Sequence, residues 1–336
     1  MSALIRLSAR NTLLRTLRGF LHAHGFLEAD TPQLVPGPGL EPHIDPLAVP
    51  VKVHVDAAAH ERFLITSPEL ALKRLLVELL DGGTPPEHAR VYQISHVFRD
   101  GERTSRHTPE FMLLEWYQVG LSLGEMMAQT AALIGACADA LAVTPPCDVR
   151  APFDHSTVQE LFARHAGIDL RACIAATDAG DGDALPRAAR AAGLMLRPGA
   201  TFDDAFVQVM GDCVEPRIGH VRPAIVSRWP ASMAVLARRC TDDALFAERF
   251  EIYAAGLELC NAFHELTDPA EQRTRFAADN AVRAALGKRT LPVDEEFLGA
   301  LGRLPPTSGN ALGVDRLLML LCGATQIDDV VAQRWR

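Results

Sequence analysis

A polar loop between two strand-like runs carries the residues with the clearest chemical potential. Arg99 ends the first run, His107 lies in the loop, and the second run starts near Phe111. Side chains of a strand alternate between its two faces, so Phe111, Glu115 and Tyr117 share one face. A carboxylate on such a face is costly to bury unless a cation pairs with it. The stretch therefore predicts a cationic ligand beside an anionic one.

A second dense stretch, residues 250–268, predicts two strands around a short turn. Asn261, Phe263 and Glu265 share one face by the period of two residues, whereas Glu258 has the opposite parity. A bulge or a twist is needed if all four side chains are to point into one site. The alternative explanation for these polar residues is a solvated face of an antiparallel sheet.

Two arginines at the ends of predicted elements suit a ligand with phosphate groups. Arg99 ends a strand, and Arg316 falls in the first turn of an apolar helix after a glycine-punctuated strand in residues 305–322. A guanidinium matches phosphate oxygens with two parallel hydrogen bonds. Glu251 and Glu258 could hold Mg²⁺ that bridges the phosphates. The sequence contains neither a P-loop nor a G-x-G-x-x-G pattern, so an ATP site of another kind is indicated.

Further carboxylates suit a ligand with ammonium groups. Glu69 starts a predicted helix, while Glu115, Tyr117 and Glu265 come from strand-like runs. Each feature alone has an ordinary explanation, since an acid is common in the first turn of a helix. A lone arginine at a strand end is likewise more often part of a surface ion pair. Together these residues predict an ATP site next to an amine site.

The elements that must position these residues are mixed helices and strands. Apolar periodicity predicts helices over residues 4–24, 68–80, 123–141 and 269–287 and strands over 47–55, 64–67 and 223–229. Shorter helical segments are predicted at 156–166, 183–193 and 202–213 in an alanine-rich region without a chemical cluster. We expect an α+β fold with a mainly helical insertion at about 145–222, and the length allows either one large domain or two modest ones.

Composition narrows the class of protein. The apolar content of 48% and the charged content of 22% are typical of a soluble globular protein. The net charge of −9 argues against a large nonspecific surface for nucleic acid. The seven cysteines form no C-x-x-C pair, so neither a zinc site nor a thioredoxin-type site is indicated. Their odd number, without a secretion signal or an apolar run of membrane-spanning length, predicts a cytoplasmic protein with no membrane partner.

Several of these stretches resemble the signature motifs of class II aminoacyl-tRNA synthetases in their lysyl form. Residues 26–32 (FLEADTP) resemble motif 1, residues 98–117 (F-R-D through P-E-F-x-x-L-E-W-Y) resemble motif 2, and residues 309–316 (GNALGVDR) resemble motif 3. Residues 67–74 (SPELALKR) and 256–268 (GLELCNAFHELTD) also look lysyl-type. The resemblance covers nearly the whole chain outside about 145–220. It implies that residues 1–336 form a single catalytic domain, with an antiparallel sheet flanked by helices, and that the chain forms a homodimer through motif 1.

The resemblance also implies a role for each matching position. Arg99 would bind the α-phosphate of ATP and stabilise charge that develops there, and Arg316 would hold the γ-phosphate, which makes them the catalytic pair. The ATP site would comprise Arg99, Asp100, Gly101, Glu102, His107, Thr108, Phe111, Glu258, Leu259, Gly313 and Arg316, with Phe111 stacked on adenine. Mg²⁺ would be bound by Glu251 and Glu258. The amino-acid pocket would comprise Ser67, Pro68, Glu69, Glu115, Tyr117, Asn261, Phe263, Glu265 and Ala311. Glu69 would take one amino group and Glu115, Tyr117 and Glu265 the other, so that the ligand supplies the cations that these acids need.

Two features separate the chain from lysyl-tRNA synthetases themselves. Motif 1 begins near residue 26, which leaves no room for an N-terminal anticodon-binding domain, and Ala311 stands where those enzymes carry glycine. Both features resemble the short paralogues that ligate (R)-β-lysine to elongation factor P. That resemblance implies formation of β-lysyl-adenylate from ATP and transfer to the ε-amine of a lysine of elongation factor P, without tRNA.

Two alternatives to this activity stay open at this stage. One is a free-standing ligase that activates α-lysine for another acceptor, and the other is a catalytically inactive regulatory paralogue. An active enzyme is favoured by the presence of Arg99, Arg316, Glu251 and Glu258. Within motif 2, Gly101 and Thr108 depart from the family pattern, which usually has an acid and an asparagine there.

Overall fold

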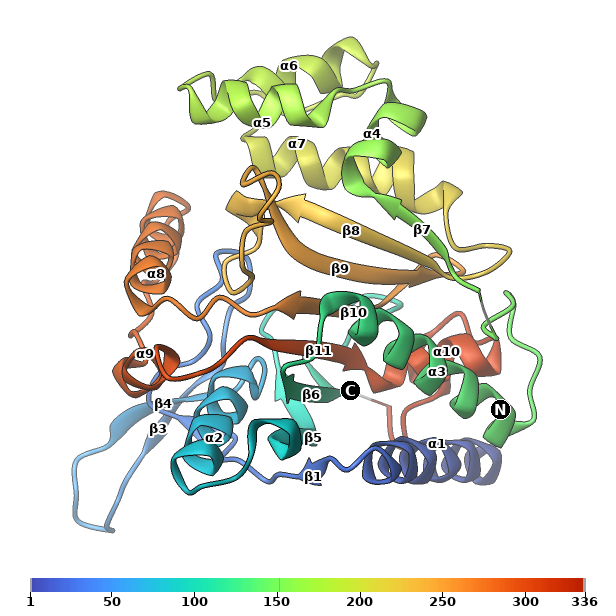
Figure 1. Ribbon diagram of the computed structural model, residues 1–336, viewed down its shortest axis with the longest axis vertical. Helices are drawn as coiled ribbons and strands as arrows, with labels where there is room; N and C mark the ends of the chain where they lie inside the picture. The colour runs from blue at the N-terminus through green and yellow to red at the C-terminus, as the bar shows by residue number, and fades with distance from the viewer. Residues whose placement is uncertain (1, 151, 335–336) are drawn as a thin grey trace.

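An eight-stranded mixed sheet runs through the computed structural model, which describes residues 2–150 and 152–334 (Figure 1). Its strand order is β1 (Leu27–Glu28), β5 (Arg90–Phe98), β6 (Glu110–Val119), β11 (Thr307–Gly313), β10 (Leu257–His264), β9 (Phe246–Ala254), β8 (Ala224–Pro230) and β7 (Asp154–Thr157). The central strands pair antiparallel, whereas β1 and β7 pair parallel with their neighbours at the two edges. A small antiparallel sheet contains β2 (Leu34–Val35), β4 (His60–Leu64) and β3 (Ala48–Val51).

The helices pack around this sheet, which confirms the predicted α+β class. They are α1 (Ala3–Ala23), α2 (Glu69–Asp81), α3 (Leu123–Leu141), α4 (Val158–Ala166), α5 (Leu170–Asp178), α6 (Ala184–Ala191), α7 (Phe202–Val209), α8 (Pro269–Ala285), α9 (Glu295–Leu301) and α10 (Val314–Cys322). Periodicity predicted α1, α2, α3 and α8 but not the short α5 and α9. The strand predicted over 64–67 ends at Leu64, because the Ser67 hydroxyl accepts a hydrogen bond from the Glu69 amide and starts the turn into α2.

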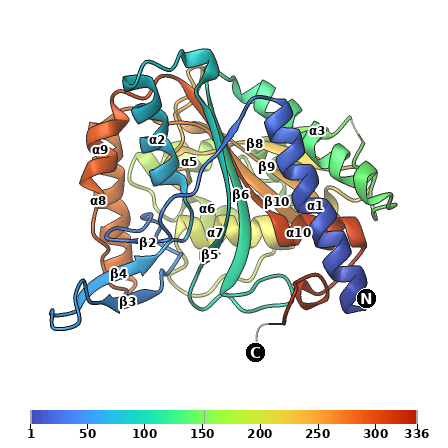
Figure 2. The same ribbon diagram turned by 90° about the horizontal axis from the view of Figure 1, so that it is seen from below.

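One face of the large sheet is covered by α1, α3 and α10 (Figure 2). Leu114 and Trp116 of β6 are fully buried against this layer. Because neighbouring strand residues point to opposite faces, Leu113, Glu115 and Tyr117 turn to the other face. The face that these helices leave open is therefore the one that carries the polar residues singled out from the sequence.

Helices α4 to α7 gather at the β7 and β8 end of the sheet, at the top of Figure 1. They have a core of their own, in which the rings of Phe162 and Phe206 stack with centroids 5.0 Å apart and Trp229 of β8 lies 5.5 Å from Phe206. This region is mostly helical, as the sequence predicts, but β7 joins it to the main sheet by pairing with β8.

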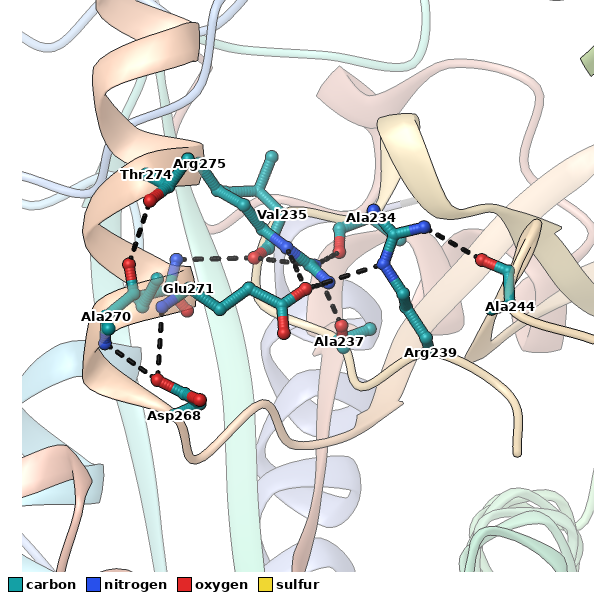
Figure 3. A network of polar contacts seen from close by, with 11 residues as sticks. Ala234, Val235, Ala237, Arg239, Ala244, Asp268, Ala270, Glu271, Thr274 and Arg275 are labelled. Atoms are coloured by element: carbon teal, nitrogen blue, oxygen red, sulfur yellow. Dashed lines mark hydrogen bonds and ion pairs between the residues drawn. The ribbon is translucent and has the colours of Figure 1, made fainter. Parts of the chain in front are cut away.

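Helix α8 anchors the connection between β8 and β9 (Figure 3). The Asp268 carboxylate caps the helix by accepting from the amides of Ala270 and Glu271 at 2.8 and 3.1 Å. Farther along α8, Arg275 donates to the carbonyls of Ala234, Val235 and Ala237 at 2.8, 3.1 and 2.9 Å. Glu271 accepts from Arg275 at 2.6 Å and so holds that guanidinium in place. The connection between β8 and β9 is thus fixed by a helix outside the sheet.

Candidate active site

Four side chains form a row across the open face of the sheet. Ala311 of β11 pairs directly with Glu115 of β6 on one side and with Asn261 of β10 on the other. Asn261 in turn pairs with Glu251 of β9. Directly paired residues of antiparallel strands point to the same face. The row therefore joins residues that lie more than a hundred positions apart in the chain.

A β-bulge brings Glu258 to the same face. The register between β10 and β9 shifts between Glu258 and Cys260, so that Glu258 pairs with Tyr253 and Cys260 with Ile252. Leu259 is the additional residue that reverses the parity. The bulge that the sequence required is confirmed.

A cavity opens on this face and collects most of the predicted residues. Those that line it are Ser67, Glu69, Arg99, His107, Thr108, Phe111, Glu115, Glu258, Leu259, Asn261, Phe263, Ala311, Gly313 and Arg316. Its lining does not include Pro68, Asp100, Gly101, Glu102, Tyr117, Glu251 or Glu265. It does include residues that were not predicted as part of the site: Glu41, Ile44, Arg106, Met112, Leu113, Cys260, Asp315 and Ile327.

Two arginines converge at one end of the cavity. Arg316 donates to the backbone carbonyl of Glu258 at 3.0 Å and to its carboxylate at 3.3 Å, and it also contacts Nε2 of His107. Burial and the nearby Arg316 charge lower the pKa of His107, so its imidazole is neutral and can accept from the guanidinium. The Arg99 guanidinium lies 5.1 Å from the centroid of the Phe111 ring. This end can bind an anion such as a phosphate.

The loop between β5 and β6 holds its predicted residues through contacts within the loop. Gly101 has φ +77°, a conformation that favours glycine, and its amide donates to the Asp100 carboxylate at 2.9 Å. Glu102 lies 4.0 Å from Arg99 across the turn. The Thr108 hydroxyl donates to the Glu110 carbonyl at 2.7 Å, so its proton is already used within the loop.

Glu115 is a buried carboxylate that hydrogen-bonds only to neutral groups. Ser67 donates to it at 2.6 Å and the Tyr117 hydroxyl at 2.9 Å. No cation among the residues that the structure describes pairs with it. Burial, with the nearby charge of Glu69, raises the pKa of Glu115 to about 8. The carboxyl group is therefore ready to bind a ligand ammonium, which would restore its ionised form.

Glu69 and Glu265 differ from Glu115, because the chain itself supplies their cation. Lys73 is 1% exposed, and its ammonium lies 2.5 Å from Glu69 and contacts Glu265 as well. The expectation that the ligand supplies the cations for all three acids is thus wrong for this pair. The spacing of four residues between Glu69 and Lys73, which puts both on one side of α2, is the sequence signal that could have revealed it.

Arg249 is the site's main residue that sequence reasoning missed. It contacts the Glu251 carboxylate, donates to Asn261 Oδ1 at 3.0 Å and donates to the Met233 carbonyl at 2.6 Å. Glu251 also accepts from the Tyr253 hydroxyl at 2.5 Å and is 4% exposed. Burial raises the pKa of Glu251 to about 7, although Arg249 opposes the rise. Because Arg249 uses the amide oxygen of Asn261, the amide NH₂ remains for a ligand acceptor.

Comparison with known proteins assigns the chain to a family. The chain matches the family described as tRNA synthetases class II (D, K and N) over residues 2–333. The chain belongs to that family. It is 37% identical over 328 residues to an elongation factor P–(R)-β-lysine ligase of Edwardsiella ictaluri (strain 93-146), which covers 96% of this chain and 93% of the relative.

Other relatives have the same name and a similar extent. The protein of Enterobacter sp. (strain 638) is 36% identical over 330 residues, with 96% of this chain and 93% of the relative covered. A third, from Erwinia tasmaniensis, is 36% identical over 343 residues, with 98% and 95% covered. The chain is accordingly an enzyme of the ligase class within the class II synthetase family. In the part of the chain that the structure describes, every helix is too short or too polar to cross a membrane.

Proposed function

We propose that the chain activates (R)-β-lysine with ATP, forms its adenylate and pyrophosphate, and transfers the β-lysyl group to the ε-amine of a lysine of elongation factor P. One observation carries the activation step: a single cavity joins an arginine pair at one end to the uncompensated carboxylate of Glu115 at the other. The names of the relatives support the isomer and the acceptor. The family match over residues 2–333 supports a class II catalytic domain, which we propose spans residues 1–336 with residues 145–222 as a helical insertion.

Arg99 and Arg316 are the proposed catalytic residues. Attack of the substrate carboxylate on the α-phosphorus increases negative charge on the phosphate oxygens, and the Arg99 guanidinium stabilises that charge. Arg316, oriented by Glu258 and His107, holds the γ-phosphate and keeps the leaving pyrophosphate in line. Phe111 offers its ring to adenine at the rim.

The proposed metal ligands are oxygen donors, as Mg²⁺ requires. Glu258 presents a carboxylate to the cavity, and Glu251 lies behind it on the same face. Among the described residues no group of three or more potential metal-ligating side chains occurs, so phosphate oxygens and water would complete the coordination. When bound, Mg²⁺ would neutralise part of the phosphate charge.

The amino-acid end suits a long diamino acid. Glu115, Ser67 and Tyr117 form a hydrogen-bonded polar group, which can bind the terminal ammonium. The Asn261 amide can donate to the substrate carboxylate. The Ala311 methyl group lies between Glu115 and Asn261 in the row, where glycine would leave more space. This restriction supports the β-isomer over α-lysine.

The homodimer is proposed from exposed apolar side chains at the start of α1 and in motif 1. Helix α1 exposes Leu4, Ile5 and Leu7, at 78, 56 and 50% of their surface, and Leu27 of β1 is 56% exposed. A second copy would bury these side chains. Sedimentation equilibrium tests the proposal, because a monomer at micromolar concentration would contradict it.

The activity is tested in two steps. ATP–pyrophosphate exchange is measured with (R)-β-lysine and with α-lysine, and transfer is then followed as a mass increase of purified elongation factor P. Exchange that prefers (R)-β-lysine, followed by transfer, is the expected result. Preference for α-lysine without transfer would indicate a ligase for another acceptor, and an inactive protein would indicate a regulatory paralogue. We place the reaction in the cytoplasm, where the proposed acceptor acts in translation.

A further inference from the structure

The loop of residues 36–46 contributes a carboxylate to the cavity that no sequence motif indicates. Glu41 lines the cavity together with Glu69, Arg99 and Glu115. Its side chain makes no hydrogen bond or ion pair with any residue that the structure describes. Glu41 is also exposed rather than packed into the core. An unpaired carboxylate in a binding cavity is available to a ligand.

The backbone that presents Glu41 is held from behind by a buried arginine. Arg283, near the end of α8, is 2% exposed and donates to the carbonyls of Glu41 and Ile44 at 3.1 and 2.9 Å. The same guanidinium donates to the Asp45 carboxylate at 2.8 Å, and Lys288 donates to its other oxygen at 2.8 Å. These bonds fix the position of the loop, so Glu41 is presented by a rigid segment.

The surroundings of Glu41 place it between the two ends of the cavity. Among the charged groups that act on the Glu41 carboxyl group, Arg99 has the largest influence and Glu69 the next. Arg99 is the residue proposed to act at the reacting phosphate, so Glu41 lies near the place where the substrate carboxylate must be. Glu115, which is proposed to bind the terminal ammonium, lies on the sheet beside Ser67 and Tyr117.

The ion pairs of the other acids in the cavity determine which carboxylate remains for a second ammonium group. Lys73 already pairs with Glu69 and Glu265. A diamino acid brings two ammonium groups, and Glu115 can bind only the terminal one. Of the other acids in the lining, Glu258 pairs with Arg316 and Asp315 pairs with Arg10. Besides Glu115, Glu41 is therefore the acid of the lining that makes no ion pair with a residue that the structure describes.

We propose that Glu41 is an ammonium-binding residue of the amino-acid pocket, which takes the amino group nearer to the substrate carboxylate while Glu115 takes the terminal one. This inference rests on the proposed function and adds a residue to its substrate site. It makes Glu41 a determinant of specificity for diamino acids over amino acids with a single terminal amine.

The test compares two ligands that differ by one amino group. The ligands are (R)-β-lysine and 6-aminohexanoate, which keeps the carboxylate and the terminal ammonium but lacks the second amine. Glu41→Gln preserves the shape of the side chain and removes its charge. A matched control is Glu61→Gln, which removes an exposed carboxylate on β4 that pairs with Arg289 outside the cavity. The readouts are the KM of exchange for (R)-β-lysine, the inhibition constant of 6-aminohexanoate and the KM for ATP.

We expect Glu41→Gln to raise the KM for (R)-β-lysine about tenfold to a hundredfold, the effect of losing one charged hydrogen bond. The inhibition constant of 6-aminohexanoate and the KM for ATP should change less than about twofold, because neither involves the second amine. Equal changes for both amine ligands, or no change for (R)-β-lysine, would overturn the inference while the proposed function stands. A wild-type protein that exchanges with neither lysine isomer would instead overturn the proposed function and this inference with it.

Discussion

The ammonium of Lys73 lies 2.5 Å from the carboxylate of Glu69, one turn earlier on α2. It also contacts Glu265, which lies just after β10. Burial alone would lower the pKa of Lys73, but the charges of Glu265 and Glu69 outweigh it and raise the pKa. The amino-acid pocket therefore has a permanent cation of its own, and a ligand adds to that charge rather than providing all of it.

Replacing Lys73 by Met should destabilise the folded chain strongly. The change leaves Glu69 and Glu265 buried without their cation, which costs about 3–5 kcal/mol of unfolding free energy. Urea unfolding measures the effect. The control Lys52→Met removes an exposed lysine and should stay within about 0.5 kcal/mol. Equal stabilities of the two variants would show that the Lys73 contacts contribute nothing net.

Glu115 should make stability depend on pH. Its pKa is about 8 in the folded chain against an ordinary value of 4.5, so the folded state binds the additional proton between these values. The free energy of unfolding contributed by this group therefore falls as pH rises from about 4.5 to 8. Glu115→Gln removes this titration. Between pH 5 and pH 8, the free energy of unfolding of the variant relative to that of the wild type should therefore rise by at least about 1 kcal/mol. Parallel stability profiles from urea unfolding would contradict the assignment.

Strand alternation predicted much of the site, because the alternation is local. The shared face of Phe111, Glu115 and Tyr117 and the bulge beside Glu258 both follow from counting residues. The ion pairs of the site could not be predicted by counting residues along a strand. Lys73 meets Glu265 only when α2 packs beside the end of β10, which depends on the tertiary fold.

The loop residues of the site were the hardest to predict from the sequence. Glu41 lies in a Gly- and Pro-rich segment with no periodicity, and Arg283, which fixes it, is more than two hundred residues away.

Arg249 is adjacent in sequence to a core phenylalanine, and its contact with Asn261 follows from strand pairing rather than from spacing. From their spacing in the sequence alone, Arg249 and Arg283 would be interpreted as ordinary surface residues.

Gly309 should not tolerate a side chain. A Cβ atom at this position would overlap the Tyr117 ring and the nearer carboxylate oxygen of Glu265. Gly309→Ala must therefore displace Tyr117 from Glu115, and we expect the KM for (R)-β-lysine to rise about tenfold or more. Gly299→Ala on α9 meets no atom within 4 Å and serves as the control. A Gly309→Ala enzyme with unchanged KM would refute the steric argument.

Arg316 should be required for adenylate formation. Its guanidinium is oriented by Glu258 and His107, and no other arginine of the cavity lining has these two partners. Arg316→Ala should lower the rate of ATP–pyrophosphate exchange by about a hundredfold or more, as for other groups that stabilise transition-state charge. Arg171→Ala breaks an exposed ion pair between the insertion and Asp243 of the β8–β9 connection, and it should leave the rate unchanged. Normal exchange by Arg316→Ala would remove this residue from the catalytic pair.

Ala311 should set the preference between the lysine isomers. Its methyl group lies in the row between Glu115 and Asn261, so it occupies space beside the substrate backbone. Ala311→Gly removes one methyl group, and we expect the ratio of kcat/KM for α-lysine to that for (R)-β-lysine to rise about tenfold. Ala262→Gly is a matched control, because Ala262 lies next to Asn261 on β10 but packs into the core on the opposite face. That control should lose stability without changing the ratio. An unchanged ratio in Ala311→Gly would mean that the carboxylates, not the methyl group, select the isomer.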